Sequence, residues 1–180
     1  MVTSVTIENT NKVSEKSKTS WLGGVGFIVI LLLAFFIFRF AVGFIVISGD
    51  SMNPTLEDSN VVFSSNIFYS VDRNDIVVFR DGHGFDVIKR VIGLPNDRVA
   101  IQDGHIFVNG DMISEAYSSG IPNDMEEIIV PGDSYFVVGD NRTPGESLDS
   151  RSSDVGPIHS SNIHGEVMFS LFPLSFQLTK

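Results

Sequence analysis

An uncharged apolar run from Trp21 to Phe38 constrains this chain more than any other stretch of its sequence. As an α-helix, these 18 residues would extend about 27 Å, which is close to the thickness of a bilayer core. A buried helix of a globular domain is seldom apolar on all sides over this length. We therefore expect a tail at 1–20, a membrane-spanning anchor at 21–38 and one solvated domain at 39–180.

The flanks of the apolar run indicate how the anchor is oriented. Residues 1–20 contain three lysines and two glutamates and are too polar to pack, so we expect a disordered tail. Arg39 is the only basic residue between the run and Arg73. The positive-inside rule then places the N-terminus in the cytoplasm and the domain outside the plasma membrane. A cleaved signal would have a shorter apolar core and a nearby Ala-x-Ala-like site, so we expect an uncleaved single-pass anchor in the lipid bilayer.

Beyond Arg39, short β-rich runs alternate with Gly, Asp and Pro, which is typical of a mostly β domain. Asn109-Gly110 lies between two apolar runs and predicts a hairpin turn. The expected strands are Ala41–Ile47, Asn60–Ser64, Asp75–Phe79, Phe85–Ile92, Arg98–Gln102, Ile106–Asn109, Glu127–Val130, Tyr135–Val138 and Glu166–Leu171. The expected fold class is therefore a mostly β, antiparallel domain that follows one transmembrane helix.

Composition excludes several classes of function. The net charge of −10 argues against a nucleic-acid partner, because phosphate binding needs clustered Lys and Arg. The chain contains no cysteine, so it has no disulfide framework, no thiolate nucleophile and no Cys-based metal site. We expect neither a cofactor nor a metal.

Ser51 is the candidate nucleophile. It lies in the run Ser48-Gly49-Asp50-Ser51-Met52-Asn53-Pro54-Thr55-Leu56, shortly after the apolar segment. Residues of these types also favour an ordinary tight turn, and loops are where catalytic groups usually lie. The run by itself leaves both interpretations open.

Lys89 is the only lysine in the body of the domain, since the others lie in the tail or at the C-terminal residue. Strand alternation places Lys89 on the same face as three apolar residues, Phe85, Val87 and Val91. Burial there would lower the pKa of the amine and favour the neutral form that a serine nucleophile needs as a general base. The alternative is an ordinary lysine whose ammonium reaches water, so a role for Lys89 depends on its pairing with Ser51.

Three motifs follow the apolar run in order. They are Gly49-Asp50-Ser51-Met52-Asn53-Pro54-Thr55-Leu56, then Lys89-Arg90-Val91-Ile92-Gly93-Leu94-Pro95, then Gly139-Asp140-Asn141-Arg142 continuing to Ser147-Leu148-Asp149-Ser150-Arg151. In order, in spacing and in following an anchor, they resemble the motifs of the bacterial type I signal peptidases. That family consists of Ser-Lys endopeptidases that remove signal peptides from exported preproteins. The resemblance covers the chain from Trp21 to its C-terminus.

The resemblance implies a role for each matched residue. Ser51 would be the nucleophile and Lys89 its general base. Ser147 would orient the lysine amine, while Asp149 and Arg151 would lie beneath the site.

The third motif also implies a supporting network of Asp140 and Arg142, for which a purely structural role is the alternative. Two features depart from the family pattern. Gly49 stands where some relatives have an oxyanion-hole serine, so the backbone N–H groups of Ser51 and Gly49 are the expected oxyanion donors. A spacer at 143–146, longer than the commonest family form, precedes Ser147.

The resemblance further implies an extended substrate that adds to strands at Gly43–Ser48 and Phe85–Ile88. Apolar side chains there would line shallow pockets that accept small residues before the cut. The expected substrate-binding residues are Ile47, Ser48, Met52, Leu56, Asp86, Val87 and Ile88. Partners are thus signal-peptide-bearing preproteins and the bilayer, with neither nucleic acid nor metal.

Alternatives remain for both the catalytic group and the function. A Ser-His-Asp triad is the competing catalytic assignment, but the four histidines fall at turn-like positions outside the motifs: His83, His105, His159 and His164. A dedicated maturase of the same fold, acting on a pilus or matrix protein, stays open. An inactive anchored binding module is a third possibility, against which the joint presence of Ser51 and Lys89 argues.

Overall fold

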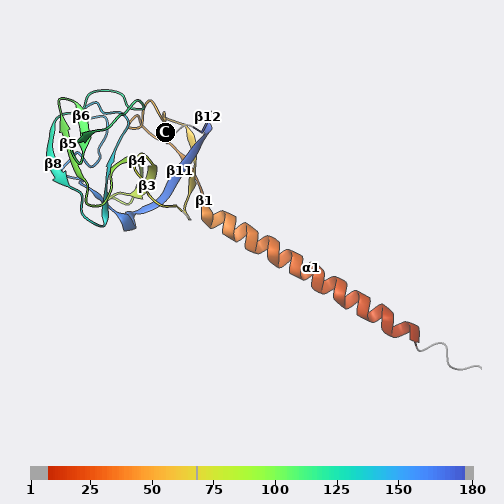
Figure 1. Ribbon diagram of the computed structural model, residues 1–180. Coiled ribbons are helices and arrows are strands. Elements are labelled where there is room, and N and C mark those ends of the chain that lie inside the picture. Colours follow the sequence, from red (N-terminus) through yellow and green to blue (C-terminus); the bar gives the residue numbers. More distant parts are fainter. Residues whose placement is uncertain (1–7, 68, 177–180) are drawn as a thin grey trace, which may run out of the picture. The chain divides into compact units, whose positions relative to one another are not determined.

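The computed structural model describes residues 8–67 and 69–176. It divides into two compact units, Met1–Ala41 and Val42–Lys180 (Figure 1). Over the described ranges, the first contains one helix and the second contains the strands.

The first unit is the helix α1 (Glu8–Ala41). Within it, Gly23–Ala41 is long and apolar enough to cross a membrane, with 19 residues of mean hydropathy 2.5 and none buried by protein. The helix begins at Glu8, so the expectation of disorder is wrong for residues 8–20, while residues 1–7 lie outside the described residues. Once an apolar run has nucleated a helix, each added residue gains a hydrogen bond at small cost, and no proline interrupts 8–20.

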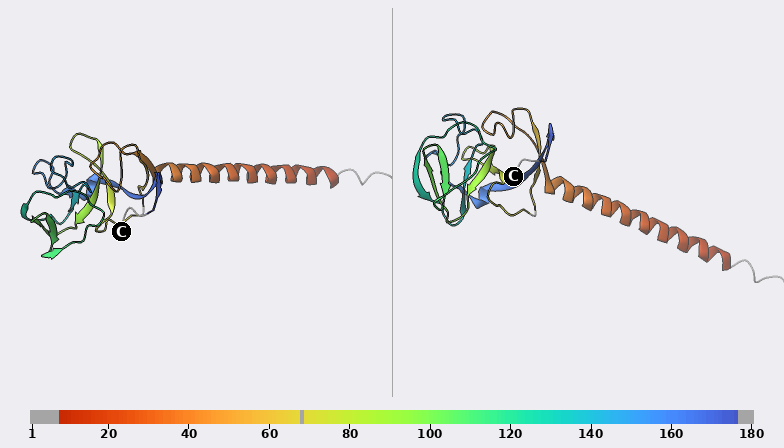
Figure 2. Two further views of the ribbon diagram at one scale, coloured as in Figure 1. Left: turned by 90° about the horizontal axis from the view of Figure 1, so that it is seen from above. Right: turned by 45° about the horizontal axis from the view of Figure 1, so that its top comes forward.

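The second unit consists of two antiparallel sheets. Its strands are β1 (Val42–Val46), β2 (Val61–Ser65), β3 (Ile76–Arg80), β4 (Asp86–Gly93), β5 (Arg98–Gln102), β6 (His105–Val108), β7 (Asp111–Met112), β8 (Met125–Ile129), β9 (Ser134–Val138), β10 (Ile158–His159), β11 (Ile163–Phe172) and β12 (Leu174–Ser175), with a 3₁₀ turn η1 (Ser160–Asn162) before β11. The larger sheet has the order β1-β2-β11-β3-β4-β9-β10, with β12 paired to β11. The smaller sheet has the order β7-β6-β5-β8 and lies at the end of the domain away from β1 and β12 (Figures 1 and 2). The mostly β, antiparallel fold class is confirmed.

Each expected run contains a strand, with ends shifted by a few residues. Asn109 and Gly110 have φ of 56° and 90°, as a two-residue hairpin turn requires, and they join β6 to β7. The predicted hairpin at Asn109-Gly110 accounts for β7, whereas the sequence did not predict β10, β12 or η1, because two or three residues are too short to show a period.

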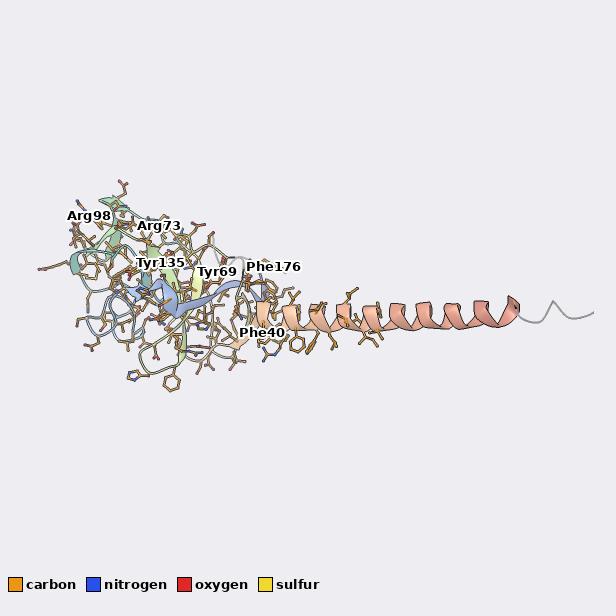
Figure 3. All side chains as sticks on the ribbon, turned by 90° about the horizontal axis from the view of Figure 1, so that it is seen from below. Phe40, Tyr69, Arg73, Arg98, Tyr135 and Phe176 are labelled. Carbon is orange, nitrogen blue, oxygen red and sulfur yellow. The ribbon has the colours of Figure 1, made fainter. Side chains whose placement is uncertain are left out.

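Three clusters of buried apolar side chains fill the domain. The first lies behind the loop that follows β1, the second joins the two sheets, and Tyr69 and Tyr135 pack against the third (Figure 3). Val87 and Val91 belong to this third cluster as expected, but Phe85 is 70% exposed. Phe85 lies in the turn before β4, where its carbonyl accepts the Asp81 N–H, so its placement on the buried face was wrong.

One edge of β4 is partly open. β3 pairs with β4 from Asp86 to Arg90, whereas β9 pairs with the opposite edge only from Arg90 to Gly93. The Val91 N–H donates to the β3 side, so alternation turns the backbone groups of Asp86 and Ile88 toward the other edge. Among the described strands, none covers that edge beside Asp86 and Ile88.

Candidate active site

The loop that carries Ser51 is held in place by the residues on both sides of Ser51. Met52 and Leu56 are buried in the first cluster on one side of Ser51. On the other side, Gly49 has φ of 92°, a left-handed conformation that favours glycine. The Ser51 carbonyl accepts the Asn141 N–H at 3.1 Å, which ties the loop to the segment that follows β9. The Ser51 hydroxyl is thereby held on rigid backbone.

Lys89 lies on β4 with its side chain directed to this loop. Its Nζ lies 2.7 Å from Ser51 Oγ, and the residue is only 4% exposed. Burial is the main reason that the pKa of Lys89 falls to about 8. Asp149 and Asp140 act in the opposite direction, while Arg151 adds to the lowering. A large fraction of the amine is therefore neutral near pH 8. Neutral Lys89 Nζ, at 2.7 Å from Ser51 Oγ, can then accept the proton of the Ser51 hydroxyl.

A second group of residues surrounds Asp149, which is buried. The carboxylate accepts hydrogen bonds from Arg151 Nε and Nη2, each at 2.8 Å, from Ser147 Oγ at 2.6 Å and from the Gly139 N–H at 2.9 Å. Burial alone would raise the pKa of Asp149, but these donors and the Arg151 charge outweigh it and hold the pKa below its usual range. Ser147 thus bonds to Asp149, and among the described residues Ser51 is the hydrogen-bond partner of Lys89.

Gly139 links this group to Ser51. A Cβ on Gly139 would lie 2.3 Å from Ser147 Oγ and 2.4 Å from the Ser51 carbonyl oxygen. Only a glycine lets the two approach this closely. Ser147 is therefore separated from the Ser51 backbone by a single residue without a side chain.

Beside Lys89, the Arg90 side chain makes a buried, bidentate ion pair with Asp140. Its Nε and Nη2 lie 2.8 and 2.6 Å from the carboxylate oxygens, and both residues are fully buried. Thr55 donates its hydroxyl to the same carboxylate, and the guanidinium stacks 4.0 Å from the ring centroid of Tyr117. Burial, with the nearby Glu115, raises the pKa of Tyr117 to about 12.

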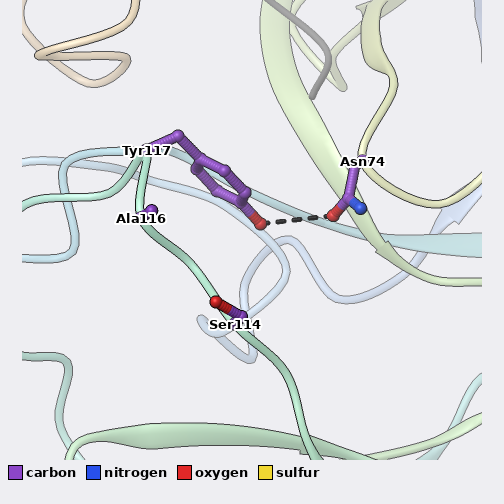
Figure 4. A pocket seen from close by; sticks show the side chains of 4 residues that line it. All are labelled: Asn74, Ser114, Ala116 and Tyr117. Atoms are coloured by element: carbon purple, nitrogen blue, oxygen red, sulfur yellow. Dashed lines mark hydrogen bonds between the residues drawn. The ribbon is translucent and has the colours of Figure 1, made fainter.

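Tyr117 also lines a pocket of about 330 Å³ (Figure 4). Its walls are Asn74, Ser114, Ala116 and Tyr117, and the Tyr117 hydroxyl donates to Asn74 Oδ1 at 3.3 Å. Arg142, also buried, donates its Nε to the Gly139 carbonyl and pairs with Glu115 at 2.6 Å. Asp140 and Arg142 thus each hold a different charged partner.

Sequence reasoning missed four of these residues. Thr55 lies inside the first motif and Gly139 begins the third, so their motif positions were the available signal. Glu115 and Tyr117 lie between motifs in a segment with no recognisable pattern, and only the folded contacts with Arg142 and Arg90 bring them forward.

The oxyanion donors need one correction. The Gly49 N–H donates to Asp58 Oδ1 at 2.9 Å, so its hydrogen-bonding capacity is used within the loop. This removes Gly49 as an expected donor, because a turn with φ of 92° points that amide toward Asp58. Among the described residues the Ser51 N–H has no partner, which leaves it available to an oxyanion.

The expected substrate-binding residues separate into buried and accessible sets. Ile47, Met52 and Leu56 belong to the first cluster, and the half-buried Ile88 packs against it. Leu56 is 0% exposed, so it can only support such a pocket from behind. The remaining residues are the exposed Ser48 and Asp86, the latter paired with Arg80, and the half-buried Val87 on the third cluster.

One Ser-His-Asp arrangement does occur, around His159. Its Nδ1 lies 2.8 Å from Ser161 Oγ and its Nε2 lies 3.0 Å from Asp133 Oδ2. However, Nδ1 also accepts the Ser161 N–H and so caps the turn η1. The side chains of His159 and Asp133 are 50% and 64% exposed, which is typical of a surface cap rather than of a desolvated catalytic group. Within the described residues, no group of His, Cys, Asp and Glu is arranged to hold a metal ion.

Comparison with known proteins covers most of the chain. The family model described as signal peptidase, peptidase S26, matches residues 20–172. Signal peptidase I P of Bacillus subtilis subsp. natto is 34% identical over 179 residues, which is 91% of this chain and 95% of that relative. The chain belongs to the signal peptidase family, peptidase S26. The family implied by the three motifs is confirmed.

Two further members of the signal peptidase family are similar to the chain. Signal peptidase I S of Bacillus subtilis (strain 168) is 32% identical over 183 residues, covering 93% of this chain and 95% of that relative. A crystal structure of a signal peptidase I from Enterococcus faecalis is 29% identical and matches 55% of this chain and 97% of that chain, with a TM-score of 0.49.

Substituting Asp140→Ala should destabilise the protein by about 3–5 kcal/mol, because it leaves the Arg90 guanidinium buried without its carboxylate. Urea unfolding of the full-length chain in detergent, monitored by far-ultraviolet circular dichroism, measures the free energy of unfolding. Glu127→Ala is the matched control, since its ion pair with Arg98 is about half exposed and should change stability by less than about 1 kcal/mol. If the two substitutions lower the free energy of unfolding equally, the buried ion pair does not stabilise the protein more than the exposed one.

Proposed function

We propose that this chain is a membrane-anchored serine endopeptidase that removes signal peptides from exported preproteins after small residues, with Ser51 as nucleophile and Lys89 as general base. The observation that carries the proposal is the 2.7 Å contact between Lys89 Nζ and Ser51 Oγ at an amine that is only 4% exposed. Membership of the signal peptidase family supports the reaction class.

The reaction is an acyl transfer. Neutral Lys89 takes the Ser51 hydroxyl proton while Ser51 Oγ bonds to the scissile carbonyl carbon, and the Ser51 N–H is an available donor to the oxyanion. The carbon–nitrogen bond then breaks, and the Lys89 ammonium returns its proton to the leaving amine. Water then gives a proton to Lys89 and attacks the acyl carbon, the bond to Ser51 Oγ breaks, and Lys89 returns the proton to Ser51 as the signal peptide is freed.

The open edge of β4 supports an extended substrate. The backbone groups of Asp86 and Ile88 face that edge and can pair with an added strand. Ile88 also packs against the cluster of Ile47 and Met52, next to Ser51, so an apolar surface lies where the residues before the cut would lie. A shallow apolar pocket of this kind favours small side chains, with Ser48 exposed in the adjacent segment.

The charged residues around the dyad are each compensated by a partner of opposite charge or by hydrogen bonds. Asp149 is bound by Arg151 and Ser147, so it stays ionised without a direct ion pair to Lys89. The pairs of Asp140 and Arg142 fix the segment after β9, whose backbone holds Ser51. In this proposal Ser147 orients the site through Asp149.

The apolar helix supplies the location. We assign 21–38 to a single-pass anchor in the plasma membrane, the tail to the cytoplasm and the domain to the outer side. Only nine residues separate Ala41 from Ser51, so the tether keeps the nucleophile within reach of cleavage sites at the membrane. Anchoring both enzyme and substrate raises their effective concentration. A maturase dedicated to one pilus or matrix protein would use the same site, and a panel of preproteins distinguishes the two.

Ser51→Ala and Lys89→Met should each lower kcat/KM for a purified preprotein by at least about a thousandfold, because each removes one half of the proton transfer. Detergent-solubilised full-length protein and gel detection of the mature product measure this. Ser161→Ala is the matched control: it removes the serine next to His159 and should leave cleavage unchanged. Full activity of Lys89→Met, or its loss in Ser161→Ala, would reject the Ser-Lys dyad.

The pH dependence of kcat/KM should show a rising limb with its midpoint near 8. Below this pH Lys89 is protonated and cannot accept a proton, and above it the neutral base predominates, so activity rises with pH. Rates measured at low substrate from pH 6 to 11 give the midpoint. A midpoint near 10.4, the ordinary lysine pKa, would show that burial does not tune the base.

The orientation of the anchor can be tested because the chain contains no cysteine. Asp111→Cys, at an exposed position of β7, should react with a membrane-impermeant maleimide in intact cells that express the protein. Ser14→Cys, in the tail, should react only after the membrane is opened. The opposite labelling pattern would reverse the orientation, and labelling of both sites in intact cells would argue against a membrane-crossing segment.

A further inference from the structure

We infer that the pocket between the segment 143–152 and the residues just before β8 is a subsite for one of the first two residues after the cut, with a preference for a cationic side chain. The inference rests on the proposed function and extends it to the leaving side of the substrate. The pocket has a volume of about 240 Å³ and is lined by Asn123, Asp124, Met125, Pro144, Gly145, Ser147, Arg151 and Ser152. Sequence reasoning gave none of these residues a role in substrate binding.

The sheet determines where the leaving side of the substrate must go. A substrate strand on the open edge of β4 lies beside Asp86 and Ile88 and reaches the dyad at Lys89. From Arg90 onward the same edge is occupied by β9. A chain that continues past Ser51 therefore has to leave the sheet where β9 ends and pass over the segment that follows it.

The pocket begins at this point. Gly139 directly follows β9, and it is held between the Ser51 carbonyl and Ser147 Oγ. Ser147 also lines the pocket, so through Gly139 the pocket lining is in contact with the backbone of Ser51. The longer spacer at 143–146 contributes Pro144 and Gly145 to the same side of the pocket, and Asn123, Asp124 and Met125 line the other side.

The volume suits a single side chain, and the charges decide which kind. Arg151 is bound to Asp149 through two nitrogens, so these two charges largely cancel. Asp124 is exposed, and among the described residues it has no ion-pair partner; its carboxylate accepts only a long contact from the Gly104 N–H at 3.5 Å. The pocket therefore presents one uncompensated negative charge, which favours Lys or Arg over Glu or Asp in an occupant.

A charge-swap experiment tests this preference. Preproteins that carry Lys or Glu at the first or the second residue after the cut are cleaved by the full-length enzyme in detergent, and kcat/KM is measured for each. At one of the two positions, Asp124→Lys should lower the Lys-to-Glu ratio of kcat/KM by about fivefold or more, while substrates with Ala there change little. Asp111→Lys is the matched control, because it places the same charge at an exposed position of the smaller sheet outside the pocket.

A second variant tests occupancy without charge. Asn123→Trp fills the pocket from an exposed position and should lower kcat/KM for Leu at the same substrate position more than for Ala. If Asp124→Lys and Asp111→Lys shift the Lys-to-Glu ratio equally, or if neither pocket variant changes specificity while cleavage still depends on Ser51, the subsite is wrong. If the unsubstituted protein shows no cleavage that depends on Ser51, the proposed function itself is rejected.

Discussion

Removal of the Lys89 amine from water is the constraint on which the site depends. A buried ammonium costs several kcal/mol unless it is paired, and Lys89, only 4% exposed, contacts a hydroxyl instead of a carboxylate. The penalty falls on the charged form, so the pKa drops to about 8. A carboxylate in the place of Ser51 would restore the ammonium and remove the base. The same desolvation that would destabilise an ordinary lysine therefore produces the general base of the proposed reaction.

The carboxylates near Lys89 are consistent with this constraint because each already has an arginine partner. Asp149 is held by Arg151, and Asp140 by Arg90, with two hydrogen bonds in each pair. Their fields at the amine partly cancel, since Asp149 raises the pKa of Lys89 and Arg151 lowers it. The ion pairs thus have two consequences. They fix the segment after β9, and they limit how far the nearby carboxylates can raise the pKa of Lys89.

The fold class and the pairing of Lys89 with Ser51 could be predicted because they leave local signals. Strand runs have a period of two, and Lys89 is conspicuous as the only lysine of the domain body. The partners of the network could not be predicted, since Tyr117 and Glu115 meet Arg90 and Arg142 only through long-range folding. The Gly49 amide was misassigned for the opposite reason, because a nearby hydrogen bond to Asp58 depends on turn geometry that residue types alone do not specify.

The register of β4 connects these elements. Lys89 and Arg90 are adjacent, so alternation sends one to Ser51 and the other to Asp140. A slip of one residue would place either the permanently charged Arg90 guanidinium against Ser51 or Lys89 against Asp140, and in neither case would a neutral amine contact Ser51. Pairing with β3 along one edge and with β9 along part of the other prevents such a slip. Because β9 stops at Val138, the same register that directs Lys89 to Ser51 also leaves the neighbouring edge of β4 unpaired, where the proposed substrate strand would bind.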